Sequence, residues 1–197
     1  IAKGIQSYDA LIEFLKQLDR SMAQPDEPLI VQGFDPIYFP GERLGAKQLD
    51  QVSQTRPIFI LHASGHLATV NTALMRKSNI TRDTQVEGVA RDANGEPTGE
   101  LQEMPAMALA TAVMQTVLGI LGDAAGISRF GAAARNGGIT TVTDLAGTVL
   151  MQPQDLSNWQ KVVNDPAFPA RICMYNAPTA PGGGVDQHGL ARPQLGC

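Results

Sequence analysis

The sequence is poor in charge and in cysteine, and it contains no basic segment. Charged residues make up 17% of its 197 residues, and 19 acidic against 15 basic side chains give a net charge of −4. Because no run of Lys or Arg could follow a phosphate backbone, nucleic acid is not an expected partner. An apolar fraction of 43% at this low charge argues against intrinsic disorder and predicts a globular chain of one large or two small domains.

The two cysteines, Cys173 and Cys197, are too few for a disulfide framework, and neither belongs to a Cys-x-x-Cys pair. We therefore expect reduced, structural thiols. The chain begins at Ile1 and shows no charged segment followed by an apolar one, so we expect no secretory signal and a cytoplasmic location. The absence of a first methionine is interpreted as the result of processing or truncation.

One uncharged stretch, 104–122, is 19 residues long and therefore close to the length that spans a bilayer. It contains Pro105, Gly119 and Gly122, and it has more Ala and Met than Leu and Ile. This composition is less apolar than that of a typical membrane span. We expect a buried or half-buried helix here and no membrane partner.

The first half of the chain is predicted to alternate helices with short strands. Ser7 is a suitable N-cap for an amphipathic helix of roughly 15 residues. Strands are expected at 29–31 and 58–61, the second with the consecutive apolar residues of a parallel strand that is covered on both faces. A helix is predicted at 67–77, so 62–66 would be a polar turn past a strand end, where α/β proteins usually bind ligands.

The second half of the chain contains a hairpin signal and two strand–helix units. Asn94 and Gly95 predict a tight turn between two antiparallel strands. Successive strand–helix units imply a parallel sheet. The last twenty or so residues have no periodic pattern. The predicted elements are hairpin strands at 86–91 and 96–101, helices at 127–136 and 153–163, and strands at 139–143 and 170–175.

Polar residues near predicted strand ends are the candidates for a functional site, because P-loop, nucleophile-elbow and His-Glu-x-x-His motifs are absent. His62 and His66 flank a turn, but Gly65 interrupts the helical spacing that would bring both imidazoles onto one metal. We favour His66 as a hydrogen-bonding or proton-transfer group that faces substrate, with a structural role as the alternative. Asn71 either lines the same pocket or bonds the local backbone.

Three carboxylates are further candidates for contact with substrate. Glu103 opens the uncharged helix, where the helix dipole favours a negative charge, and it could also act on a ligand. Asp35 and Asp144 each end a predicted strand. That position faces the active site in β/α barrels, although Asp is also a common cap and turn residue.

Taken together in their order and spacing, several segments carry a family resemblance. They are Gly33–Asp35, Leu49–Asp50, Arg56–Pro57, Gly65–His66, Val70–Leu74, Asp92 with Gly95–Leu101 and Glu103, and Gly138–Val142 with Asp144. This set resembles amidohydrolase family 3, in particular its YtcJ-like branch of metal-dependent hydrolases. The resemblance covers roughly residues 30–175.

The resemblance implies an α/β fold, namely part of a (β/α)₈ TIM barrel of the metal-dependent hydrolase type with a long excursion that contains a β-hairpin. Residues 1–125 would be the excursion, and 126–197 would hold barrel units followed by an irregular loop. The implied chemistry is hydrolysis of a C–N bond other than a peptide bond in a small-molecule substrate, by water that a divalent metal activates, usually zinc. Homo-oligomerisation is left open.

The same resemblance leaves the metal ligands outside this chain. The family's first-strand His-x-His pair would precede Ile1, and its later Lys, His and Asp would follow Cys197. No metal-ligand position is therefore assigned here, and we expect the isolated chain to be inactive because a metal site needs its ligands. The alternatives are a non-catalytic amidohydrolase-like barrel with a binding or regulatory role, and an unrelated α/β binding domain.

Overall fold

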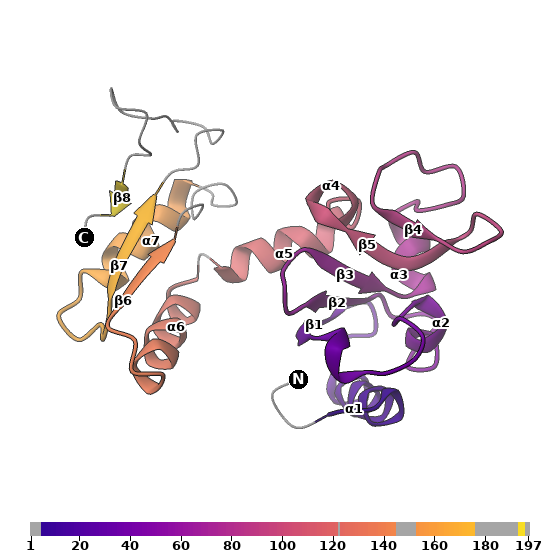
Figure 1. Ribbon diagram of the computed structural model, residues 1–197, viewed down its shortest axis with the longest axis horizontal. Coiled ribbons are helices and arrows are strands. Elements are labelled where there is room, and N and C mark those ends of the chain that lie inside the picture. The colour runs from indigo at the N-terminus through magenta and orange to yellow at the C-terminus, as the bar shows by residue number, and fades with distance from the viewer. Residues whose placement is uncertain (1–4, 122, 145–152, 176–192, 196–197) are drawn as a thin grey trace. The chain divides into compact units, whose positions relative to one another are not determined.

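The computed structural model describes residues 5–121, 123–144, 153–175 and 193–195. The chain divides into two compact units, Ile1–Gln115 and Thr116–Cys197. Each unit contains its own β-sheet, with helices packed against it (Figure 1). The mixed α/β class expected from the sequence is therefore confirmed.

The first unit contains a mixed five-stranded sheet. Its strands, in spatial order, are β1 (Leu29–Phe34), β2 (Ile58–His62), β3 (Leu67–Val70), β5 (Pro97–Gln102) and β4 (Val89–Arg91). β1 and β2 are parallel, as expected for a strand with consecutive apolar residues. The other neighbouring pairs are antiparallel, and the pairing of β4 with β5 confirms the predicted hairpin.

The helical segments of this unit are α1 (Tyr8–Ser21), the 3₁₀ turn η1 (Pro36–Tyr38), α2 (Ala46–Leu49), α3 (Thr72–Lys77) and α4 (Glu103–Met107). The boundary between the two units falls inside α5 (Thr111–Leu121). The predicted cap of α1 is confirmed, because the Ser7 hydroxyl accepts a hydrogen bond from the N–H of Ala10 at 3.2 Å. α4 lies against β5 and β3 (Figure 1).

Alternation along the strands divides the buried apolar side chains between the two faces of the sheet. Ile58 and Ile60 on β2 point to one face, and Phe59 between them points to the other. The first face packs against α1 and the segment around α2, through Leu11, Leu15, Leu29, Phe34, Phe39, Leu44 and Leu49. The sheet is therefore covered on both sides near β2.

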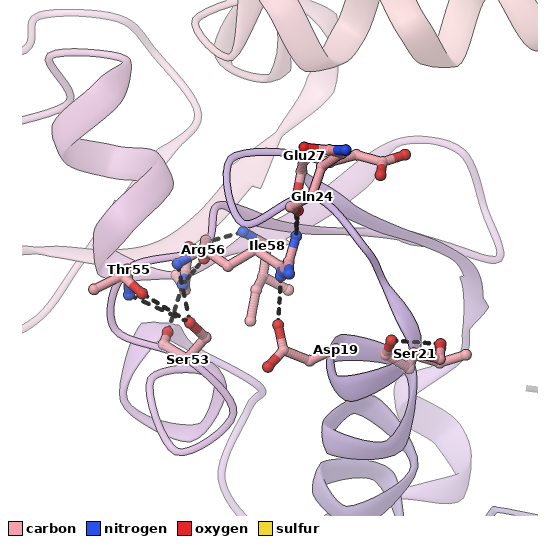
Figure 2. Close-up of polar contacts among 10 residues, drawn as sticks. Asp19, Ser21, Gln24, Glu27, Ser53, Thr55, Arg56 and Ile58 are labelled. Atoms are coloured by element: carbon pink, nitrogen blue, oxygen red, sulfur yellow. Dashed lines mark hydrogen bonds and ion pairs between the residues drawn. The ribbon is translucent and has the colours of Figure 1, made fainter.

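Arg56 connects the end of α1 to the start of β2. Its side chain is buried, its Nε donates to Asp19 on α1, and its Nη1 donates to the carbonyl oxygens of Gln24 at 2.6 Å and Glu27 at 2.7 Å (Figure 2). The backbone N–H of Arg56 also donates to Ser53 Oγ at 2.9 Å. One planar guanidinium thus fixes the loop between α1 and β1.

The second unit contains α6 (Ala124–Asn136), β6 (Thr141–Asp144), α7 (Pro153–Val163), β7 (Arg171–Tyr175) and β8 (Pro193–Leu195). β6 and β7 are parallel, which confirms the predicted strand–helix–strand unit. β8 pairs antiparallel with β7 and was not predicted, because its three residues carry no periodic signal. Residues 176–192 lie outside the described part of the chain.

Two sequence predictions about elements are wrong. The predicted helix at 67–77 is helical only in α3, since Leu67–Val70 form strand β3. Gly65, at φ 74°, closes a tight turn in which its N–H donates to His62 O at 3.0 Å, and pairing with β2 and β5 on both sides outweighs helix propensity. The predicted uncharged helix is likewise broken, into α4 and α5.

The expectation of reduced thiols is wrong for Cys173, which is buried in β7 and disulfide-bonded. The number and spacing of cysteines do not reveal which of them the fold brings together, and Cys197 lies outside the described residues.

Within the described part of the chain, no single helix has the length and apolarity to cross a bilayer. Only the pair Thr111–Gly119 and Ala124–Asn136, bent by 61° at a break, has the required length and apolarity when the two helices are taken together.

Candidate functional site

Two of the predicted site residues, 37 positions apart, meet in the structure. His66 Nδ1 lies 2.9 Å from Glu103 Oε2, and the two side chains are 68% and 67% exposed. His66 ends the turn between β2 and β3, and Glu103 follows the last residue of β5. The pairing of β3 with β5, in which Leu67 lies opposite Gln102, brings the two positions together where β3 begins and β5 ends.

The backbone of Glu103 is held in an unusual conformation at this point. Its φ is 63°, in the left-handed region that residues with a Cβ rarely adopt. Its N–H donates to His66 O at 2.7 Å, so backbone and side chain both bind the same histidine. A backbone conformation of this kind is kept only where surrounding contacts hold the residue in place, and such positions cluster at functional sites.

The pair has a defined donor and acceptor arrangement. An ionised carboxylate only accepts hydrogen bonds, so the proton between the two groups belongs to His66 Nδ1. His66 Nε2 is then left as an acceptor with no partner among the described residues. Since this side chain is mostly exposed, Nε2 can accept a proton or a hydrogen bond from a molecule outside the fold.

A second polar group lies on the face of the sheet that packs on α1, with His62, Thr69 and Glu100 buried and Arg43 and Gln102 exposed. His62 Nε2 lies 2.9 Å from Thr69 Oγ1, and Glu100 accepts from Arg43 Nε at 2.6 Å and from Gln102 Nε2 at 2.6 Å. We call His62, Thr69, Glu100, Gln102 and Arg43 the polar cluster. His62 Nδ1 is buried without a hydrogen-bond partner among the described residues.

Burial controls the ionisation of His62. Desolvation lowers the pKa of its imidazole below 6.5, and the charge of Arg43 acts in the same direction. The negative charges of Glu100 and Asp35 oppose this effect by raising the pKa. The net direction is downward, so His62 is a neutral residue of the sheet.

The side chain of Asn71 uses all of its hydrogen-bond donors and acceptors on the backbone. Its Oδ1 accepts from the N–H groups of Ile58 and Leu74, both at 3.0 Å, and its Nδ2 donates to Ser53 O at 2.8 Å and Arg56 O at 2.9 Å. Its side chain is fully buried. Of the two roles considered from the sequence, this geometry favours the one in which Asn71 bonds the local backbone.

The two aspartate candidates have no described contact with the exposed pair, and each is placed within its own unit. Asp35 caps η1, because its Oδ1 accepts from the N–H of Ile37 at 3.1 Å. Asp144 is the last residue of β6, in the other unit. Their roles toward a substrate stay predictions.

The described residues do not fit a complete metal centre. No group of three or more His, Cys, Asp or Glu side chains lies close enough to hold an ion in that part of the chain. His66 and Glu103 supply two ligand-type groups, but a catalytic divalent ion needs at least three protein ligands in most sites. No metal-ligand role is assigned to them.

The sequence interpretation did not single out Arg43, Thr69 or Gln102. A signal for the last of these was present, because Thr98, Glu100 and Gln102 alternate with Gly99 and Leu101 as the two faces of a strand do. Arg43 has no such signal, since its contact with Glu100 joins positions 57 residues apart.

Comparison with known proteins gives a consistent picture. The sequence model described as "Amidohydrolase family" matches residues 3–194. The chain is 31% identical over 102 residues to YtcJ of Bacillus subtilis (strain 168), which is named as an amidohydrolase. It is 25% identical over 146 residues to the protein LONG AFTER FAR-RED 3 of Arabidopsis thaliana. These alignments cover 50% and 73% of this chain, but 19% and 24% of the two relatives.

Two solved structures share the fold over 89% of this chain. They are uncharacterized metal-dependent hydrolases from Pyrococcus horikoshii OT3, with a TM-score of 0.52 at 20% identity, and from Pyrococcus furiosus, with a TM-score of 0.50 at 17% identity. This chain covers 32% and 33% of them, so it spans about a fifth to a third of the proteins that it matches. Since the family match extends over nearly the whole sequence, the chain belongs to amidohydrolase family 3.

Proposed function

We propose that this chain is the substrate-facing part of a hydrolase that cleaves a C–N bond other than a peptide bond in an amide or a cyclic amide. Family membership supports hydrolysis in general, and the two structural neighbours are named metal-dependent hydrolases. The proposed scaffold is part of a (β/α)₈ barrel, of which β6, α7 and β7 form one unit.

The observation that carries the proposal is the exposed contact between His66 Nδ1 and Glu103 Oε2. Exposed histidine and carboxylate side chains gain little stability from pairing, so the contact is not explained by the stability of the fold. The left-handed backbone at Glu103 adds a conformational cost for the same geometry.

The pair has two roles in this proposal. Glu103 orients the imidazole, while His66 Nε2 binds the substrate amide and moves a proton at that atom. A histidine is suited to this because its ordinary pKa lies close to neutrality. The divalent metal that the family uses, for which we propose zinc, would activate the attacking water, and no group of three ligand-type side chains lies together among the described residues.

The test is turnover of a panel of amides and cyclic amides by the complete gene product. His66→Gln and Glu103→Gln should each lower kcat/KM by about 100-fold, because the first removes the proton-transfer group and the second removes the carboxylate that orients it. Glu13→Gln is the matched control, since Glu13 belongs to an exposed ion pair with Lys16 at the same distance of 2.9 Å. Its kcat/KM should stay within about twofold of wild type.

The same assay distinguishes the alternative of a non-catalytic barrel. A complete gene product that binds no metal, ignores a chelator and turns over no amide would contradict the proposal and favour a binding or regulatory role. Equal activity losses in Glu103→Gln and Glu13→Gln would remove His66 and Glu103 from the proposed site.

A further inference from the structure

A cavity of about 350 Å³ lies between α6 and α7 in the second unit, and we call it the α6–α7 cavity. Ser128, Ala132 and Arg135 of α6 line it together, because positions four and seven residues apart share one face of a helix. Lys161 and Asp165 line it from the end of α7. Its volume is near the lower end of the roughly 300–1,000 Å³ of known ligand pockets, so it suits a small molecule.

The two cations of this cavity have no other partner. Neither Arg135 nor Lys161 makes a side-chain hydrogen bond or ion pair with another described residue. Each lies in the last turn of its helix, where the helix dipole favours a cation. The dipole explains a cation on each helix, but it does not require both cations to line one cavity. Two cations in one wall can bind a single carboxylate, whose two oxygens match the guanidinium of arginine in particular.

Asp165 adds a negative charge to the same wall. Its Oδ1 accepts from the N–H of Ala167 at 2.8 Å and so fixes the loop that leads into β7, whereas its Oδ2 has no partner among the described residues. Asp165 follows the last residue of α7, Val163, by two positions, and the carbonyl end of a helix also favours a positive charge. The cavity therefore offers binding groups for a negative and for a positive charge.

The rest of the wall is mostly apolar. Val162, Phe168 and Pro169 line the cavity together with Ala132. The ring of Phe168 lies directly against α6, since a Cβ on Gly131 would be 2.6 Å from one of its carbons. Apolar side chains with a few polar groups are typical of pockets for small molecules, so the ligand should have an apolar body and a charged end.

We propose that the α6–α7 cavity binds a small α-amino acid with an apolar side chain. Arg135 and Lys161 bind its carboxylate, Asp165 Oδ2 accepts from its ammonium group, and the apolar wall contacts its side chain. An α-amino acid provides a partner for all three charged residues, which a simple anion or a simple amine does not. The inference goes beyond the proposed function, because it concerns binding in the second unit and no step of hydrolysis.

The test compares three ligands that share a phenyl ring. L-phenylalanine carries both charges, 3-phenylpropionate lacks the ammonium group, and phenethylamine lacks the carboxylate. Binding of each ligand to the complete gene product is measured by calorimetry. Wild type should bind L-phenylalanine about 3- to 10-fold more tightly than either of the other two, since each of them lacks about one net hydrogen bond.

Removal of single charges should separate the same ligands. Arg135→Gln and Lys161→Gln should each weaken binding of L-phenylalanine and 3-phenylpropionate by about 3- to 10-fold and should not weaken binding of phenethylamine. Asp165→Asn should weaken binding of L-phenylalanine and phenethylamine by a similar factor and should not weaken binding of 3-phenylpropionate. Its carboxamide oxygen can still accept from Ala167, so the loop is preserved.

Arg129→Gln is the matched control, because Arg129 is an exposed arginine of the same helix that does not belong to the wall of the cavity. It should leave the affinity for all three ligands within about twofold of wild type. Ala132→Leu tests the cavity itself, since the larger side chain takes up space in its wall and should weaken binding of all three ligands. Thermal unfolding of each variant identifies a merely structural role, which would lower stability without distinguishing the ligands.

The inference is overturned if wild type does not bind L-phenylalanine, if it binds the three ligands equally, or if Arg129→Gln and Arg135→Gln have equal effects. Binding that depends on Arg135 and Lys161 but not on Asp165 would also overturn it, in favour of a site for a simple anion. Because the readout is binding and not turnover, failure of the proposed hydrolysis would leave this result unchanged.

Discussion

At the scale of single residues, Asn71 and His66 show how similar positions near strand ends acquire different roles. Asn71 follows β3 and is fully buried, with both amide hydrogens and two oxygen lone pairs used by the backbone. His66 precedes β3 and is mostly exposed, with one ring nitrogen free among the described contacts. The sequence left Asn71 open between a pocket role and a bond to the local backbone and favoured a substrate-facing role for His66, and burial and hydrogen-bond partners distinguish the two residues.

The role of Asn71 predicts a large effect for an isosteric substitution. Asn71→Asp should destabilise the fold by on the order of 3 kcal/mol, because it turns a carboxylate oxygen toward two buried carbonyls that now lack a donor. Denaturant unfolding measures this change. Asn94→Asp, in the exposed hairpin turn, is the control and should cost much less. Equal effects of the two substitutions would contradict the structural role of Asn71.

The lowered pKa of His62 predicts how stability depends on pH. In the unfolded chain the imidazole binds a proton near its ordinary pKa of 6.5, whereas the buried imidazole binds one only at lower pH. The unfolded state therefore gains protons first as the pH falls. The contribution of His62 should be unchanged above about pH 7.5, and stability should decrease from about pH 6.5 downward.

His62→Gln isolates this effect, because a carboxamide can still bond Thr69 but does not titrate. The difference between the unfolding free energies of wild type and His62→Gln should change between about pH 7.5 and pH 5 in the direction that favours the variant at low pH. Parallel curves over that range would show that burial does not shift the pKa of His62.

At the scale of elements, two helical glycines differ in whether their surroundings leave room for a side chain. A Cβ on Gly131, in α6, would lie 2.6 Å from a ring carbon of Phe168, whereas a Cβ on Gly119, in α5, would meet nothing within 4 Å. The first glycine is required by the close approach of an aromatic ring. The second has no packing reason among the described residues.

This contrast predicts opposite signs for one substitution. Gly119→Ala should stabilise the protein by up to about 1 kcal/mol, since alanine is the better helix former. Gly131→Ala should destabilise it by about 1–3 kcal/mol, because the ring of Phe168 must move. Thermal unfolding of both variants measures the difference, and a stabilising Gly131→Ala would contradict the described packing.

The sequence correctly predicted the elements that depend on residues close to one another in the chain. The cap at Ser7, the hairpin turn at Gly95 and the β-branched run that becomes β6 are confirmed. Strand β3 could not be predicted in this way, because Leu67–Val70 are extended by their neighbours β2 and β5. The contact between His66 and Glu103 depends on the same pairing, so their spacing in the sequence gave candidates but not the geometry.

At the scale of the whole molecule, family membership and the described side chains have to be reconciled. The family match covers residues 3–194, but the chain spans a third or less of each protein that it resembles. No group of three ligand-type side chains lies together in the described ranges. We therefore expect residues other than His66 and Glu103 to supply the ligands of the divalent metal in the complete gene product.

This expectation separates substrate binding from metal binding in one experiment. Elemental analysis should find the same metal content in wild type, His66→Gln and Glu103→Gln, while kcat/KM falls in both variants. A chelator should abolish turnover in wild type and lower its unfolding temperature, since a bound metal stabilises the folded state by mass action. A loss of metal in either variant would make that residue a ligand, because removing one ligand from a site of three or four weakens binding severely. The exposed pair would then belong to the metal centre and not to the substrate.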